Sequence, residues 1–226
     1  FFLFWKFGLR GAWLPNVKVL AVFGLLTLAG AYGFHLYHKA MTDAQSGGVA
    51  ARVVKEYYRL EKVPDPSFVS PFMVAQSTER FEDAPIRVIE YSDFLCPDCL
   101  FLHEQLLRLK AEFAGKINIA LQFFPLDHCN EVVMEKANLH AGACDLAYIA
   151  AHDPGKFLEI HNDIFSHYQE AKSPEWRIEL AKRYGVEAAL SDPNTKDLVH
   201  RIMNTGSEDG KTAAKFAHSI RSTPAI

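Results

Sequence analysis

The sequence predicts an α/β domain that follows an apolar N-terminal helix. Two observations predict this arrangement: all 27 acidic residues lie beyond position 40, and the β-branched run 86–91 is followed closely by a helical pattern that begins near Cys96. The acid-poor part at 1–40 is therefore set apart from a charged, globular remainder. We expect 1–16 to be a residual membrane or cytoplasmic-side segment, and 73–226 to be the folded domain.

Composition and charge narrow the functional classes. A formal net charge of −3, with 24 basic residues and no run of Lys or Arg, lacks the electrostatic footprint of a nucleic-acid binder. Four cysteines are too few for a disulfide scaffold in a chain of this length, so each is considered in its own surroundings. We expect no nucleic-acid partner.

The segment 17–37 is predicted to be a transmembrane helix, since it has 21 residues and a single charge, Lys18. The alternative is a cleaved signal peptide, whose apolar region is shorter. Basic residues concentrate before this segment, and they indicate that the domain lies outside the cytoplasm. The segment 38–72 is predicted to be a tether with a short helix, because 46–48 is Ser-Gly-Gly and three prolines lie between 64 and 71.

A Cys-x-x-Cys motif lies between the predicted strand and helix. A cysteine at a helix N-terminus is stabilised as a thiolate by unpaired N–H groups and by the helix dipole, so Cys96 is the predicted nucleophile. Pro97 suits the first helical turn, and Cys99, one turn further, is placed to resolve a mixed disulfide. The carboxylate of Asp98 opposes thiolate formation and predicts a less strongly oxidising pair than a basic residue there would give.

Metal binding is the alternative interpretation of this motif. Structural zinc sites usually have a second closely spaced pair of ligands, whereas Cys129 and Cys144 are fifteen residues apart. The ten histidines form no tight ligand cluster, and surface or core roles are expected for them, His128, His140, His161 and His167 included. We therefore expect no metal and no organic cofactor, because the cysteine pair carries the electrons itself.

The residues IEYSDFLCPDC, a second strand at 117–124 that ends in Phe-Pro-Leu, and the distant Ser-Thr-Pro-Ala at 222–225 resemble the DsbA-like branch of the thioredoxin superfamily. The resemblance implies a thioredoxin-like fold with a helical insertion at about 130–206. It implies that Pro224 is a cis-proline which, with Thr223, faces the cysteines and binds the substrate backbone. The strands that should follow Pro224 are expected to lie outside this sequence.

Glu90 matches the position where this family places a buried acid that assists proton transfer, although a solvent-facing strand residue is the alternative. Asp93 is expected to be a cap. Within the insertion the pattern predicts helices at 131–151 and 157–165, and a third that starts at Ser173 with a proline in its first turn.

A second resemblance concerns the start of the chain, which looks like the junction between membrane helices and such a domain in bacterial homologues of vitamin K epoxide reductase. It implies a bacterial inner-membrane protein with its domain in the periplasm and, if upstream helices exist, a link to quinone through them. A vitamin K epoxide reductase-like or DsbB-like protein is the expected membrane redox partner. In such an oxidising compartment Cys129 and Cys144 are expected to form a structural disulfide, with two buried thiols or a second exchange pair as alternatives.

These observations predict a protein-disulfide oxidoreductase that acts on cysteine-containing extracytoplasmic proteins. A reductase or isomerase would have the same residues but a lower reduction potential. A copper-delivery module that uses Cys96 and Cys99 as soft ligands is the alternative outside this class of enzyme.

Overall fold

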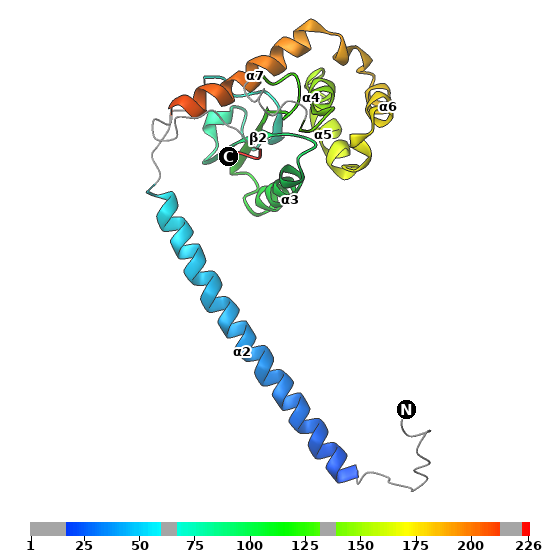
Figure 1. The fold of residues 1–226 in the computed structure, drawn as a ribbon. Helices are drawn as coiled ribbons and strands as arrows, with labels where there is room; N and C mark the ends of the chain where they lie inside the picture. Colours follow the sequence, from blue (N-terminus) through cyan, green and yellow to red (C-terminus); the bar gives the residue numbers. More distant parts are fainter. Residues whose placement is uncertain (1–16, 60–66, 132–138, 213–222) are drawn as a thin grey trace, which may run out of the picture. The chain divides into compact units, whose positions relative to one another are not determined.

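The structure is a computed structural model that describes residues 17–59, 67–131, 139–212 and 223–226 (Figure 1). The chain divides into two units, residues 1–61 and 62–226. Each unit is described by itself below. The predicted segment 1–16 lies outside the described residues.

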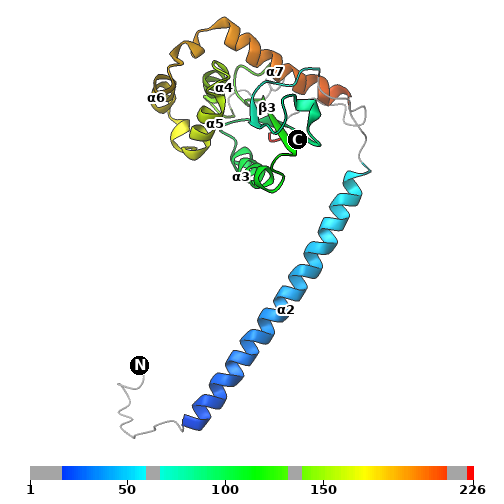
Figure 2. The ribbon, with the colours of Figure 1, turned by 180° about the vertical axis from the view of Figure 1, so that it is seen from behind.

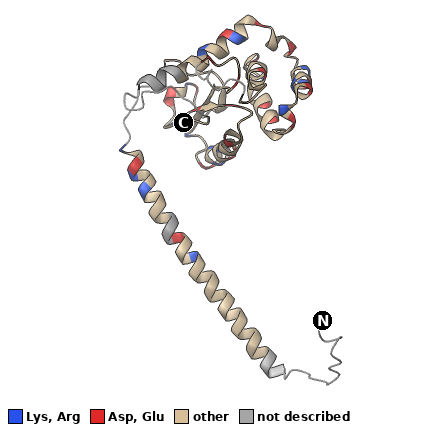
Figure 3. Cartoon of the chain, in the orientation of Figure 1, with Lys and Arg blue, Asp and Glu red and all other residues tan. Residues whose placement is uncertain are grey.

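In the described residues of the first unit a long helix, α2, spans Val17–Tyr57. Its residues 21–38 carry no charged side chain, and Lys39 is the first charge of this helix beyond them (Figure 3). Among the residues that the structure describes, no helix is both long and apolar enough to cross a membrane. The prediction of a transmembrane helix at 17–37 is therefore not supported by the structure.

The helix also continues into the predicted tether, as far as Tyr57. A break was expected at 46–48, with a second helix after it, but α2 is unbroken as far as Tyr57. Each glycine costs about 1 kcal/mol relative to alanine inside a helix. Extending an existing helix nevertheless adds one hydrogen bond per residue, whereas a separate helix would have to nucleate again. Continuation is therefore favoured over a break at these glycines.

The second unit is built on a three-stranded sheet with the order β1-β3-β2. The strands are β1 (Met73–Ala75), β2 (Ile86–Ser92) and β3 (Ile117–Phe123). The β2 and β3 strands are parallel, with Ile86 opposite Ile117 at one end of the register, and β1 pairs with β3 in the antiparallel sense. Every residue of the central strand β3 is buried, so this strand lies at the middle of the core.

The helix α3 (Pro97–Glu112) connects β2 to β3, as a parallel pair of strands requires. The insertion contributes α4 (Ala143–Ala151), α5 (Phe157–Ser166), α6 (Pro174–Tyr184) and α7 (Pro193–Thr212). The helices α4, α5 and α6 gather at one end of the domain, and α7 leads from them back along the sheet, where it packs on β3 (Figures 1 and 2). This is a thioredoxin-like α/β arrangement with a helical insertion.

The start of α4 differs from the predicted helix at 131–151. Residues 139–142 form a turn, α4 begins only at Ala143, and 132–138 lies outside the described residues. Gly142 has a φ of 98°, which other residues rarely adopt, and the guanidinium group of Arg177 fills the space that a Cβ atom would need. This glycine is the N-cap residue of α4, and its left-handed backbone is not helical, so the helix begins only after it.

Two other predicted helices of the insertion are present. The helix α5 covers the predicted segment 157–165. The hydroxyl of Ser173 accepts a hydrogen bond of 3.3 Å from the Trp176 N–H and caps α6, whose first residue is Pro174.

Two histidines are buried in an aromatic cluster formed by side chains of α3, α5 and the loop that precedes α3. The rings of His103 and His161 lie 4.8 Å apart at a steep angle, and His103 stacks on Phe165 with a centroid distance of 4.6 Å. Phe94 and Phe157 also contact His161, which is 1% exposed. Burial, and to a smaller extent the neighbouring His103, lower the pKa of His161 to about 3.

We predict that this cluster makes the fold sensitive to acid. His161 takes up a proton in the unfolded chain near its ordinary pKa of 6.5 but resists protonation in the folded state down to about 3. Stability is therefore retained above pH 6.5 and falls as the pH drops below it, by up to about 1.4 kcal/mol per pH unit. Urea unfolding of the wild type and His161→Phe between pH 7 and 4 measures the difference in slope.

His128→Gln is the control for this experiment, because the His128 side chain is 65% exposed. It should keep the wild-type slope, whereas His161→Phe should have a shallower one. Equal slopes for the wild type and His161→Phe would show that the buried imidazole does not cause acid sensitivity.

Candidate active site

Cys96 lies where the loop that follows β2 enters α3. It is the N-cap residue of that helix, with an extended backbone (φ −80°, ψ 124°), and Pro97 is in the first turn. Its carbonyl accepts the N–H of Leu100 at 3.2 Å, which begins the helical hydrogen bonds. The sulfur atom is thus held at the positive end of a helix of 16 residues.

The two sulfur atoms of the motif are reduced and differ in their surroundings. Cys96 is 4% exposed and Cys99 is 0% exposed. The Cys96 thiol donates to the carbonyl oxygen of Thr223 at 3.3 Å, and the Cys99 sulfur accepts the N–H of Asp93 at 3.4 Å. Cys96 therefore faces the C-terminal segment, while Cys99 is turned toward the loop that precedes it.

These surroundings move the two pKa values in opposite directions. A hydrogen bond from the Cys99 thiol lowers the pKa of Cys96 to about 6, against the effect of burial, and N–H groups of Cys99 and Asp98 also contribute. The same contact with Cys96, together with burial, raises the pKa of Cys99 well above its ordinary value. At neutral pH one thiolate and one thiol share the motif, with the negative charge on Cys96.

The peptide bond between Thr223 and Pro224 is cis, in the position that the family resemblance implies. Next to it, Ala225 pairs with Tyr91 of β2 through two backbone hydrogen bonds of 2.8 and 3.1 Å. This short bridge holds the Thr223 carbonyl against Cys96. The structure thus brings together residues more than 120 positions apart in the sequence.

Glu90 is a buried acid on β2 with an exposure of 1%. Burial raises its pKa to about 7, and the side chain of Ser92 lowers it to a smaller extent. Among the described residues, neither Glu90 Oε1 nor the Ser92 hydroxyl has a hydrogen-bond partner, yet Ser92 is close enough to lower the pKa of Cys99 as well. Ser92 therefore lies between the carboxyl group and the buried thiol.

Asp93 does more than the expected capping. Its Oδ1 atom accepts the N–H of Leu95 at 2.7 Å, and its Oδ2 atom accepts the N–H of Leu126 at 2.7 Å. The same Oδ2 atom lies 2.7 Å from Nδ1 of His140. Sequence reasoning missed His140, since nothing near it in the chain signals a partner 47 residues away.

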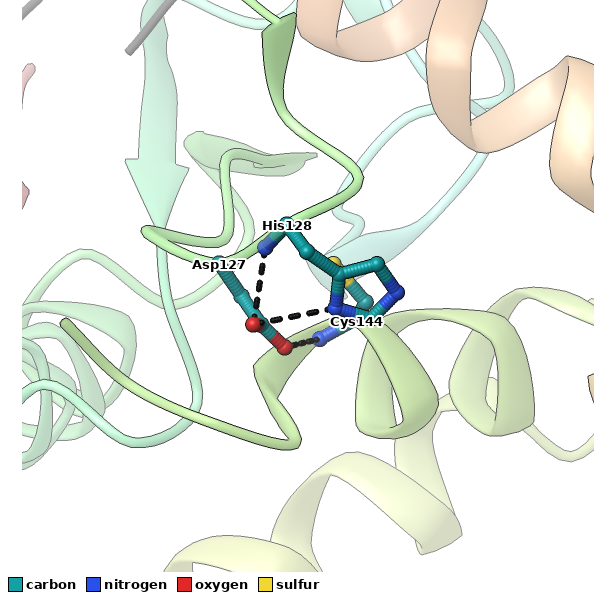
Figure 4. A group of neighbouring side chains, drawn as sticks. All are labelled: Asp127, His128 and Cys144. Carbon is teal, nitrogen blue, oxygen red and sulfur yellow. Dashed lines mark hydrogen bonds and ion pairs between the residues drawn. The ribbon is translucent and has the colours of Figure 1, made fainter. Parts of the chain in front are cut away.

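One further cluster has the donor types of a metal site. Atoms of Asp127, His128 and Cys144 lie within 4.8 Å of one another (Figure 4). Cys144, however, is joined to Cys129 in a disulfide, so it offers no thiolate. The Asp127 carboxylate already accepts the N–H groups of His128, Gly142 and Cys144 at 2.7 to 3.2 Å. This group is an anchor for the start of α4, and its donors do not fit a metal ion.

The arrangement as a whole fits thiol chemistry. It holds a cysteine at a helix N-terminus whose thiolate is favoured, a protonated partner one turn away, and an acid with a pKa near neutrality. These are the groups needed to form a mixed disulfide, to resolve it and to move the proton that exchange requires.

Residues 81–226 match the family model described as Thioredoxin. The chain is 27% identical over 163 residues to the probable disulfide bond formation protein D of Bacillus cereus. This match covers 66% of this chain and 71% of that protein. It is also 25% identical over 147 residues to the Na(+)/H(+) antiporter NhaA 1 of Mycolicibacterium gilvum. That match covers 64% of this chain, which spans only 22% of the antiporter's length.

Among solved structures, alpha-DsbA1 of Wolbachia pipientis is similar with a TM-score of 0.49 and 15% identity, over 72% of this chain and 74% of that one. Alpha-DsbA2 of the same organism has a TM-score of 0.45 and 18% identity, over 63% of this chain and 70% of that one. The predicted junction with a vitamin K epoxide reductase-like membrane part stays a prediction. The chain belongs to the thioredoxin family, and within it the chain is similar to the DsbA-like thiol-disulfide oxidoreductases.

Proposed function

We propose that this chain exchanges disulfides with cysteine-containing proteins outside the cytoplasm, with Cys96 as the nucleophile and Cys99 as the resolving cysteine. The observation that carries this proposal is the split in pKa between the two thiols: Cys96 is lowered to about 6 and Cys99 is raised. Only a thiolate attacks a disulfide, so the split assigns a different role to each sulfur.

The exchange balances without another redox group. When the pair is oxidised, a substrate thiolate attacks Cys96, the sulfur–sulfur bond breaks, and Cys99 leaves with the electron pair and takes up a proton. A second substrate thiolate then attacks the substrate sulfur of the mixed disulfide, and Cys96 leaves as a thiolate. The substrate loses two electrons and becomes a disulfide, while the cysteine pair gains them. No organic cofactor is needed for these steps.

Three further residues of the site serve this exchange. Glu90 gives a proton to Cys99 as it leaves, or accepts one when Cys99 attacks, and its pKa of about 7 suits both directions. Thr223 and Pro224 present backbone beside Cys96, where an extended substrate segment would bind. Because Cys96 is stabilised as a thiolate, the reduced pair is favoured, and oxidation of substrates is the favoured net direction.

The location and the recycling partner are also proposals. The disulfide between Cys129 and Cys144 supports an oxidising compartment such as the bacterial periplasm, since such bonds are rare in the cytosol. A pair that oxidises substrates must be reoxidised after each turnover. We propose a membrane redox partner for that step, of the vitamin K epoxide reductase-like or DsbB-like kind.

The equilibrium constant of the Cys96–Cys99 pair with glutathione tests the proposed function. We expect the full chain to equilibrate with glutathione and to have a reduction potential nearer to about −120 mV than to about −270 mV, because the Cys96 thiolate stabilises the reduced form. A value near −270 mV would make the protein a reductase. Stoichiometric Cu(I) binding without turnover of a dithiol peptide would instead indicate a metal-delivery module.

Cys99→Ala should trap the intermediate of this reaction. The variant lacks the resolving thiol, so a disulfide-containing peptide should stay bound to Cys96 as a mixed disulfide that mass spectrometry detects. It also lacks the hydrogen bond to Cys96, so the pKa of Cys96 should rise. Cys99→Ser keeps an O–H donor and should trap the same species with a smaller rise. Capture of the peptide by Cys96→Ala would contradict the assigned roles.

Glu90→Gln should be slower and also more stable. A neutral amide cannot accept the proton of Cys99, so we expect exchange at pH 8 to slow by about tenfold or more. In the wild type the raised pKa of Glu90 means that its contribution to stability is full below pH 4.5 and is lost as the pH rises through about 7. The variant should therefore gain about 2–3 kcal/mol at pH 8, measured by urea unfolding. A slower variant with unchanged stability would contradict the buried ionised state.

A further inference from the structure

The contact between Asp93 and His140 lies beside the cysteine pair and is not used in the exchange steps above. The Nδ1 atom of His140 is 2.7 Å from Asp93 Oδ2. The Asp93 side chain is 0% exposed and that of His140 is 16% exposed. An ionised carboxylate buried to this extent needs a charged or strongly hydrogen-bonding partner, and His140 provides one.

Asp93 connects this contact directly to both cysteines. Its carbonyl oxygen accepts the N–H of Cys96 at 3.1 Å, and its own N–H donates to the Cys99 sulfur at 3.4 Å. His140 is held in place independently, because its N–H donates to the Leu126 carbonyl at 3.0 Å. The imidazole of His140 therefore contacts the side chain of the same residue, Asp93, whose backbone contacts both cysteines.

The charge of His140 also depends on that of Cys96. Its pKa is raised chiefly by the hydrogen bond to Asp93, against the effect of burial, and the charges of Asp93, Cys96 and Asp127 raise it further. Coupling between two titrating groups is reciprocal. If the Cys96 thiolate favours a proton on His140, a proton on His140 must favour the thiolate on Cys96 by the same free energy.

Three acids among the described residues lie in the segments around Cys96. Asp93 lies in the same loop, Asp127 follows β3, and Asp98 is exposed at the start of α3. Like charges nearby disfavour a thiolate. A positive charge on His140 offsets the negative charge of Asp93, which is buried. His140 therefore supplies, from a segment distant in sequence, the positive charge that the Cys-Pro-Asp-Cys motif lacks.

We propose that His140 is a positioning residue that, as an imidazolium ion paired with Asp93, stabilises the Cys96 thiolate and makes the cysteine pair more oxidising. This inference deepens the proposed function and rests on it. It assigns a role to a histidine outside the Cys-Pro-Asp-Cys motif, and it attributes part of the redox behaviour of the pair to an electrostatic contact.

The experiment compares the full chain with His140→Gln, in which an amide N–H can still donate to Asp93 but the charge is absent. The pKa of Cys96 is followed by thiolate absorbance and by its rate of alkylation against pH. The equilibrium constant is measured in glutathione buffers at pH 7. We expect a higher Cys96 pKa in His140→Gln and a shift of about threefold to tenfold toward the oxidised pair.

Two matched variants separate charge from packing. His140→Lys restores a cation and should return the pKa of Cys96 and the equilibrium constant toward the wild-type values. A purely structural role of His140 would not give this rescue. His128→Gln removes an exposed imidazole that bonds Asp127 and should change neither quantity. An unchanged Cys96 pKa in folded His140→Gln would overturn the proposal.

A measurement on the unmodified protein covers the case in which the variants do not fold. The pKa of His140, followed by its imidazole proton signal, should be lower in the oxidised protein than in the reduced one, because oxidation removes the thiolate. Equal values in both redox states would overturn the inference while leaving the exchange activity intact. Failure of the pair to equilibrate with glutathione would instead overturn the proposed function.

Discussion

The geometry of the site depends on one buried carboxylate, that of Asp93. It fixes the loop between β2 and α3 through the N–H of Leu95, and it attaches this loop to the segment after β3 through the N–H of Leu126. The backbone of the same residue contacts both Cys96 and Cys99. A side chain that joins the sheet, the redox loop and the start of the insertion thus determines where the thiolate forms.

Burial alone does not decide which group of this site is charged. Glu90, Cys96 and Cys99 are all less than 5% exposed, yet the pKa values of Glu90 and Cys99 are raised and that of Cys96 is lowered. The difference lies in the contacts of each group: Cys99 donates its thiol to Cys96, which raises the pKa of Cys99 and lowers that of Cys96, whereas burial is the main cause for Glu90. Cys96 receives the thiol of Cys99 and N–H groups of the first helical turn, whereas Glu90 Oε1 has no donor among the described residues.

The parts of the structure that could be predicted from the sequence depend on local patterns. Strand β2, helix α3 and the helix that starts after Ser173 follow from apolar spacing and capping residues within a few positions. The contact of Asp93 with His140 could not be predicted, because it joins residues 47 positions apart and the histidine has no distinctive neighbours. The late start of α4 was missed for the same kind of reason: Gly142 accommodates Arg177, which belongs to another helix.

The oxidising power of the pair and the stability of its fold are two aspects of one free energy. In the unfolded chain Cys96 has an ordinary pKa, and only the folded domain lowers it to about 6. The interactions responsible come chiefly from Cys99 in the first turn of α3, and to a smaller extent from the side chain of Thr223, which is distant in sequence, so they are lost together when the chain unfolds. A fold that stabilises the thiolate is therefore more stable when reduced than when oxidised, by the amount that drives disulfide transfer to a substrate. The same coupling leaves an unfolded chain with a smaller fraction of Cys96 thiolate at neutral pH than the folded protein has.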